Sequence, residues 1–362
     1  MLRRTFAFLC LASLGALCDR ALHPVFCTQS ARRLGQVGQD LVSAAASPDG
    51  KSVAGLRCEG PEKWSVTVWE TTTGRVQLKP QTLPHPPATT NALAWSPNSQ
   101  FLAVGSSSEV SLFHLSGQTR KRLAAQWLVR DVRFSQDYVM ARADGAVFVW
   151  RWDSGTLVLK LTQDHLLAAA LNGPGGVLAT ASFQDNIRLY GLANGRLMRT
   201  LPAGPATIGL EFARQGHSLA AAFRFQSNRS RDYAVVYDWS SGQPKATDLS
   251  QPDIMGFAVS QDGNRLLTRS EQLCRIWDGN TGKLVLERPL ASPYTDSLSS
   301  DGQLVGSLGP QGNNVALWRA DSGREFARLE HTRRPFSYKF FQPGLFQVVD
   351  GACSVWQVTA RG

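Results

Sequence analysis

The sequence lacks the short motifs by which most enzymes and metalloproteins are recognised. It contains no HExxH motif, no GxSxG nucleophile elbow, no phosphate-binding loop and no dinucleotide fingerprint. None of its six cysteines forms a CxxC pair, and no D-x-D-x-D-G calcium loop is present. The glycine-rich stretch at residues 173–176 occupies a turn position. We therefore predict a protein without catalytic residues, without a metal and without a cofactor.

Charged residues are also scarce, at 18% of the chain. The net charge is nevertheless +10, from 38 basic and 28 acidic residues, which would suit an anionic partner. The basic residues are spread along the chain, and no nucleic-acid-binding motif accompanies them. We expect no specific nucleic-acid partner.

No uncharged apolar run in the chain is long enough to cross a bilayer comfortably. The run at residues 5–18 is fourteen residues long and follows a short basic start, Arg3-Arg4. This pattern predicts that residues 1–21 are a signal peptide or an N-terminal anchor. We expect the protein to be exported to a periplasm or to the exterior. The alternative is a protein anchored in the membrane by its N-terminus, and we expect no other contact with a membrane.

Four cysteines lie beyond that segment. Cys274 and Cys353 each stand three residues before a strand-ending tryptophan, where a buried small apolar side chain is expected. Cys27 and Cys58 lie nearer the N-terminus, and a disulfide between them is a hypothesis for an exported protein.

The sequence does contain a repeat, which occurs eight times. Each copy has an apolar strand, a Ser/Pro/Asp/Gly turn, a second apolar strand and a third strand that ends in an aromatic. From the first of these aromatics to the last is 287 residues over seven intervals, a period of 41. The eight aromatics are Trp69, Phe113, Trp150, Tyr190, Tyr237, Trp277, Trp318 and Trp356.

A period near 40 with four short strands per unit is typical of a β-propeller. We therefore predict an all-β fold, a single β-propeller of four-stranded antiparallel blades over residues 22–362. No linker interrupts the repeats. Only six residues follow Trp356, so the last unit lacks a fourth strand, and residues 30–34 are expected to supply it. This favours eight blades, with seven as the alternative.

From about residue 30 to 358 the chain resembles the WD-repeat family. The resemblance rests on the SPDG turn at residues 47–50, Trp277-Asp278, the variant Tyr237-Asp238 and the TGK turn at residues 281–283. It implies a propeller that acts as a platform for other proteins. Family units also carry a histidine before the first strand and an aspartate before the third. His85, His165 and His331 match the first position, and Asp144 and Asp350 the second, so only the last unit has both.

Two units carry extra residues between their second and third strands, at 58–64 and 223–233. In a WD-like propeller these insertions share a face with the loops between blades. Arginines and aromatics are the residue types that binding hot spots use most. The candidate partner-binding residues on these loops are Lys63, Trp64, Arg224, Phe225, Arg229, Arg231, Tyr233, Tyr294, Arg333 and Arg334.

Three charged residues, Arg133, Glu211 and Lys339, stand at matched places in first strands that are otherwise apolar. We expect them to pair or to reach water in the central channel. A ligand role for them is the alternative.

These observations predict a monomeric, non-enzymatic platform for another protein, whose identity the sequence leaves open. Two alternatives remain. One is a small-ligand-binding or enzymatic propeller that uses its central channel, and the other is a peripheral component of the cell envelope.

Overall fold

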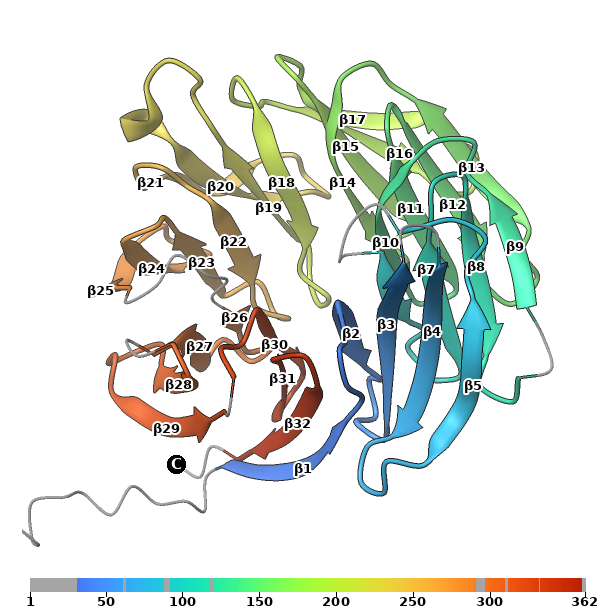
Figure 1. Ribbon diagram of the computed structural model, residues 1–362. Helices are drawn as coiled ribbons and strands as arrows, with labels where there is room; N and C mark the ends of the chain where they lie inside the picture. Colours follow the sequence, from blue (N-terminus) through green and yellow to red (C-terminus); the bar gives the residue numbers. More distant parts are fainter. Residues whose placement is uncertain are drawn as a thin grey trace, which may run out of the picture.

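The strands form eight four-stranded antiparallel sheets arranged in a ring (Figure 1). The computed structural model describes residues 31–60, 63–87, 92–117, 120–290, 297–309, 312–331 and 333–359. Within them lie 32 strands and a single turn of 3-10 helix, η1 (Arg229–Arg231). The all-β prediction and the eight-blade prediction are both confirmed.

Blades are numbered here along the chain. Blade 1 comprises β2 (Ser43–Ala46), β3 (Ser52–Gly60), β4 (Lys63–Glu70) and β5 (Val76–Thr82). Blade 2 comprises β6 (Leu93–Trp95), β7 (Phe101–Gly105), β8 (Glu109–His114) and β9 (Arg120–Ala124). Blade 3 comprises β10 (Val129–Ser135), β11 (Tyr138–Ala143), β12 (Ala146–Arg151) and β13 (Leu157–Thr162). Blade 4 comprises β14 (Leu166–Asn172), β15 (Val177–Ser182), β16 (Ile187–Gly191) and β17 (Leu197–Leu201).

The second half of the ring continues the same order. Blade 5 comprises β18 (Thr207–Phe212), β19 (Ser218–Phe223), β20 (Tyr233–Asp238) and β21 (Pro244–Ser250). Blade 6 comprises β22 (Gly256–Val259), β23 (Arg265–Arg269), β24 (Leu273–Asp278) and β25 (Leu284–Pro289). Blade 7 comprises β26 (Ser297–Leu298), β27 (Leu304–Leu308), β28 (Asn314–Arg319) and β29 (Glu325–Glu330). Blade 8 comprises β30 (Ser337–Gln342), β31 (Leu345–Val349), β32 (Cys353–Val358) and β1 (Ala31–Val37).

The core lies between blades rather than within one sheet. Residues of blades 4 and 5 form one buried cluster, and residues of blades 1 and 2 form another. Middle strands are therefore covered on both faces, and every residue of β15 and of β19 is buried. Outer strands face solvent, and four of the five residues of β17 are exposed. This explains why the second and third strands read as unbroken apolar runs.

The recurrent turn between first and second strands is built from its own side chains. In blade 1 the Ser47 hydroxyl donates to Asp49 Oδ1 at 2.6 Å and accepts from the Ser52 amide at 2.9 Å. Asp49 Oδ1 also accepts from the Lys51 amide, and Gly50 has φ +71°, the left-handed region that favours glycine. The same serine–acid geometry recurs at Ser260 with Asp262 and at Ser299 with Asp301.

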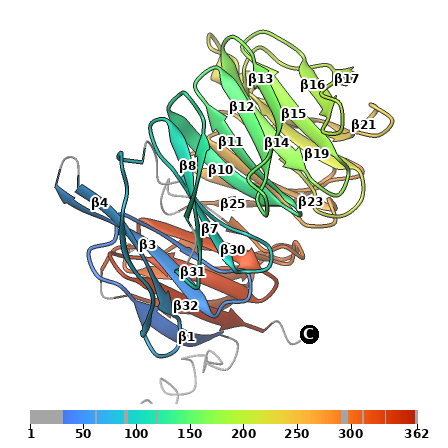
Figure 2. The same cartoon turned by 90° about the vertical axis from the view of Figure 1, so that its right-hand side faces the viewer.

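The two ends of the described chain close the ring together. β1 pairs with β32 from Ala31 opposite Val358 to Val37 opposite Cys353, as predicted from the missing fourth strand. At the seam with blade 1, the buried amide of Gln347 accepts from Ala46 N at 2.8 Å and donates to Ala44 O at 3.2 Å. Blade 8 lies across the ring from blade 4 in both views (Figures 1 and 2). The N-terminal strand thus gives blade 8 the same four strands as the other seven blades.

The histidine positions expected from the family resemblance are only partly correct. In blade 8 the ring of His331 is 3.5 Å from Asp350 Oδ2, and both side chains are buried. His85 and His165 are instead exposed, and Asp144 pairs with Arg130 at 2.8 Å.

In blade 6, Gln251 accepts a hydrogen bond in a buried series of side chains that starts at Trp277. Trp277 Nε1 donates to Thr268 Oγ1 at 2.7 Å, and Thr268 donates to Gln251 Oε1 at 2.6 Å. Gln251 Nε2 then donates to Leu273 O at 3.0 Å. In blade 4, Thr180 donates to Gln163 in the same manner at 2.8 Å. Blades 4 and 6 therefore each have a hydrogen bond from a buried threonine to a glutamine, whereas blade 8 has the His331–Asp350 pair.

Cys274 and Cys353 are buried, as predicted. Residues 1–21, Cys27 and Tyr294 lie outside the described residues, so the signal, its anchor alternative and the Cys27–Cys58 disulfide remain predictions.

Candidate partner-binding face and central channel

Strands alternate in direction within each blade, so two kinds of connection emerge on one side of the ring. These are the turns between second and third strands and the loops between blades. We call this side the insertion face, because it carries residues 58–60, 63–64 and 224–232. The other side, with the turns at residues 47–50 and 281–283, is the opposite face.

The insertion of blade 5 folds around a buried carboxylate. Asp232 is fully buried. Its Oδ1 accepts from the Phe225 amide at 2.8 Å, and its Oδ2 accepts from Arg229 Nε at 3.0 Å and from the Ile254 amide at 3.2 Å. Figure 1 shows the resulting loop, with its short 3-10 turn, beyond the ends of β19 and β20. The loop is therefore held in one shape before any partner arrives.

The predicted residues of this insertion divide into two groups. Arg224 donates to Ile254 O at 2.7 Å, and Arg229 pairs with Asp232, so both arginines hold the loop. Tyr233 is half-buried against Phe223, with ring centroids 5.0 Å apart. In the remaining pair Arg231 is exposed and Phe225 is half-buried, and the guanidinium of Arg231 lies 4.8 Å from the ring centroid of Phe225.

The insertion of blade 1 extends a hairpin. Lys63, at the tip, forms an ion pair with Glu59 at 2.7 Å. Trp64 is half-buried and packs against the apolar cluster between blades 1 and 2. Lys63 is thus the outward residue of this predicted pair, while Trp64 covers the core.

The loop before blade 8 brings basic and apolar side chains together on the insertion face. Arg333 and Arg334 are both exposed, and Phe336 is 45% exposed two residues later. Arg333 lies over Gly351 and Arg334 beside Gly312, each in a neighbouring turn of the same face.

Three large apolar side chains surround the mouth of the channel on this face. Phe336, Met255 and Leu167 are 45%, 44% and 36% exposed, and each is adjacent in the chain to the residue that begins a first strand. Leu167 and Met255 line a cavity of about 220 Å³ between blades 3 and 6, and Phe336 lines the larger channel cavity. Sequence reasoning missed all three.

The three charged residues predicted to face the channel do so. Arg133, Glu211 and Lys339 all line a channel cavity of about 660 Å³. Arg133 pairs with Asp131 of its own strand at 2.8 Å, while Glu211 acts on it at longer range and helps to raise the pKa of its guanidinium. Burial raises the pKa of the Glu211 carboxyl.

A family model for the WD domain, G-beta repeat, matches residues 79–114, which run from β5 to the end of β8. The fold is a WD40-like β-propeller. No curated protein sequence is significantly similar to this chain.

Solved structures agree with this propeller along nearly its whole length. The computationally designed Ika8 protein is 16% identical, with a TM-score of 0.67 over 90% of this chain and 100% of its own. The C-terminal WD40 domain of Sif2 is 14% identical, with a TM-score of 0.69 over 91% of this chain and 99% of its own. The Cps50 (Swd1) β-propeller domain of Myceliophteria thermophila is 14% identical, with a TM-score of 0.56 over 91% and 100%. At these identities the likeness establishes the fold alone.

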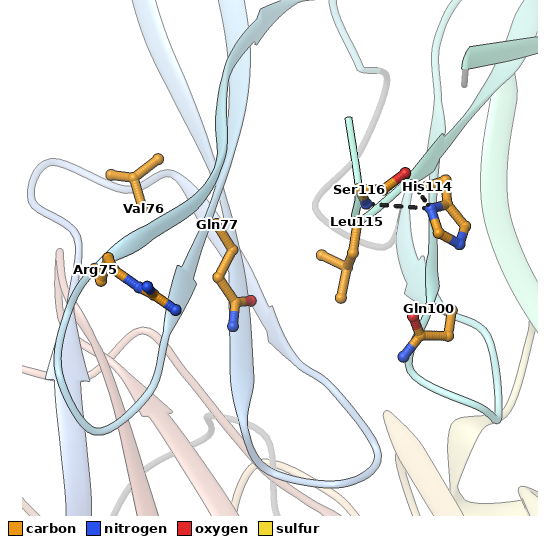
Figure 3. A pocket seen from close by; sticks show the side chains of 7 residues that line it. All are labelled: Arg75, Val76, Gln77, Gln100, His114, Leu115 and Ser116. Carbon is orange, nitrogen blue, oxygen red and sulfur yellow. Dashed lines mark hydrogen bonds between the residues drawn. The ribbon is translucent and has the colours of Figure 1, made fainter. Parts of the chain in front are cut away.

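The WD40-like propeller has a further groove on its opposite face, between blades 1 and 2 (Figure 3). It holds about 530 Å³ and is lined by Arg75, Val76, Gln77, Gln100, His114, Leu115 and Ser116. In this groove His114 Nδ1 accepts a hydrogen bond from the Ser116 amide at 3.1 Å. None of the predicted residues lies here.

Within the described residues, no His, Cys, Asp and Glu side chains group as they would to hold a metal ion. Over the same residues, no helix of the propeller is both long and apolar enough to cross a membrane.

Proposed function

We propose that this chain is an exported, monomeric, non-enzymatic platform that binds another protein through its insertion face. WD40 propellers generally act as scaffolds for protein interactions. The observation that carries the proposal is the ring of exposed apolar side chains, Leu167, Met255 and Phe336, around the channel mouth.

This surface includes an aromatic ring, a methionine and arginines, residue types that are enriched at protein interfaces. Large apolar groups supply area that a partner would remove from water. Because each is already more than half covered, burying the rest is worth about 1 kcal/mol per side chain. Arg333 and Arg334 stand beside Phe336 and supply planar donors at the rim of the same surface.

The blade 5 insertion on this face is ordered before binding. Asp232 fixes the insertion of blade 5, and Arg224 ties that insertion to Ile254, the residue before Met255. A preordered surface loses little conformational entropy when a partner docks, so more of the contact energy becomes affinity.

A cross-linking pull-down from the native host tests the proposed face. The test variant replaces Leu167, Met255 and Phe336 by alanine. The control variant replaces Leu197 and Met198, which are 53% and 59% exposed on the outer strand β17. A protein lost from the first variant and kept by the second supports the proposal. Equal profiles for wild type and both variants would refute this face as the binding surface.

Export rests on residues 1–21, and fractionation of the full chain tests it. A processed protein in the periplasm or medium is expected. Release only by detergent would indicate the N-terminal anchor, and release by salt would favour a peripheral envelope component held by basic charge.

A further inference from the structure

The channel cavity is large enough for a metabolite. At about 660 Å³ it falls within the usual range of small-ligand sites. Its lining runs from Val42 and Phe336 near the insertion face to Pro48 and Gln342 at the turns of the opposite face. The inner strands of most blades contribute to it, so a ligand inside would be surrounded by rigid backbone.

The charges that line this cavity are unbalanced. Three cationic side chains, Arg133, Arg214 and Lys339, face two carboxylates. Asp131 is engaged by Arg133 at 2.8 Å. Glu211 accepts a hydrogen bond from the Val259 amide, and its burial favours the neutral carboxyl. The lining therefore carries one more cation than carboxylates, even when both carboxylates are ionised.

Among the three cations, the surroundings of Lys339 give the strongest indication of a ligand. Its side chain is accessible from the channel, and no hydrogen bond or ion pair joins its ammonium to another described residue. The surrounding protein limits its hydration and lowers the pKa of the Lys339 amine. The nearby Cys353 thiol is no counterion, because burial raises its pKa to about 12.

We propose that the channel binds a small oxyanion, with carboxylate or phosphate groups, between Lys339, Arg214 and Arg133. The ammonium supplies a point charge, and the guanidinium groups supply forked donors that match such groups. The cavity volume favours a ligand with several anionic groups over a lone halide.

Isothermal titration with citrate and with inorganic phosphate, at constant ionic strength set by sodium chloride, tests the site. Constant ionic strength removes the general screening effect that any salt has on a basic protein. We expect saturable binding of at least one anion to the wild type. Lys339→Met should weaken that binding at least about tenfold, because it removes a charge-assisted contact.

Two variants separate a specific site from a general or structural effect. Lys79→Met removes the same charge from an exposed position on β5 and should bind as the wild type does. Lys339→Arg keeps the charge in the channel and should retain most of the affinity. Binding by neither anion would overturn the proposal, as would equal affinity for the Lys339→Met and Lys79→Met variants.

This site stands apart from the proposed platform function. A variant that replaces only Leu167 and Met255 leaves the lining of this cavity unchanged, so it should bind the anion even if it loses a protein partner.

Discussion

The two insertions of this propeller occupy the same position in their blades, yet they are stabilised in different ways. The insertion of blade 1 prolongs the ladder between β3 and β4, with Cys58 opposite Trp64 and Gly60 opposite Lys63. The insertion of blade 5 leaves the ladder after Phe223 and Tyr233, and its backbone is satisfied by Asp232 instead. The first depends on strand pairing and an apolar cover, whereas the second depends on one buried carboxylate.

The largest effect should come from Asp232→Ala. The change leaves two backbone N–H groups and Arg229 without their acceptor, at a cost of about 3 kcal/mol in the free energy of unfolding. Urea denaturation measures the cost, and limited proteolysis should cut within residues 224–232. Asp253→Ala is the control, because Asp253 is exposed and lies 3.6 Å from the same arginine. Equal destabilisation by both changes would contradict a carboxylate-centred loop.

Trp64→Ala should have the next largest effect. The half-buried indole covers the cluster between blades 1 and 2, and its loss should cost about 2 kcal/mol. Trp64→Phe should restore most of that stability, since an aromatic ring still covers the cluster. If neither change moves the urea midpoint, Trp64 is a surface residue and regains its predicted role as a binding anchor.

Phe225→Ala should have a smaller effect, about 1 kcal/mol. The ring contacts the Arg231 guanidinium and lies 6.2 Å from the Tyr233 centroid, but it is not fully buried. A double-mutant cycle with Arg231→Ala measures the contact itself. A coupling energy of zero would mean that the two side chains are independent in solution.

Lys63→Ala should leave the urea midpoint unchanged. Its ion pair with Glu59 is exposed, with side-chain exposures of 72% and 44%, and such pairs contribute little. A clear loss of stability would show that the tip of the blade 1 hairpin depends on charge, as the blade 5 loop does.

The fold could be predicted because the repeat is visible at every level of the sequence. The period can be counted along the sequence, and the serine–acid turns can be recognised from their residues. The short last unit predicts that an N-terminal strand completes it. The blade networks could be predicted only in part. Gln251 makes the hydrogen bonds expected of a histidine, and no spacing rule distinguishes a buried amide from a surface one.

The channel mouth shows why the site was harder to predict than the fold. Leu166 and Leu167 are identical neighbours in β14, yet the first is buried and the second is 36% exposed. The pairing of β14 with β15 shifts register between Leu166 and Ala168, which decides where each side chain points. Exposure of this kind depends on register and on the facing blade, so the sequence alone does not reveal it.

The pairing of β1 with β32 also determines when the ring can close during synthesis. Arg32 and Gln357, which touch in that sheet, are 325 residues apart in the chain. At usual rates of ribosomal synthesis, roughly 5–20 residues per second, β1 waits from about fifteen seconds to a minute for its partner. Throughout that interval it presents an unpaired edge, while seven blades can already form behind it. Chaperones therefore have an interval in which they can bind a chain that is largely synthesised but whose ring is still open.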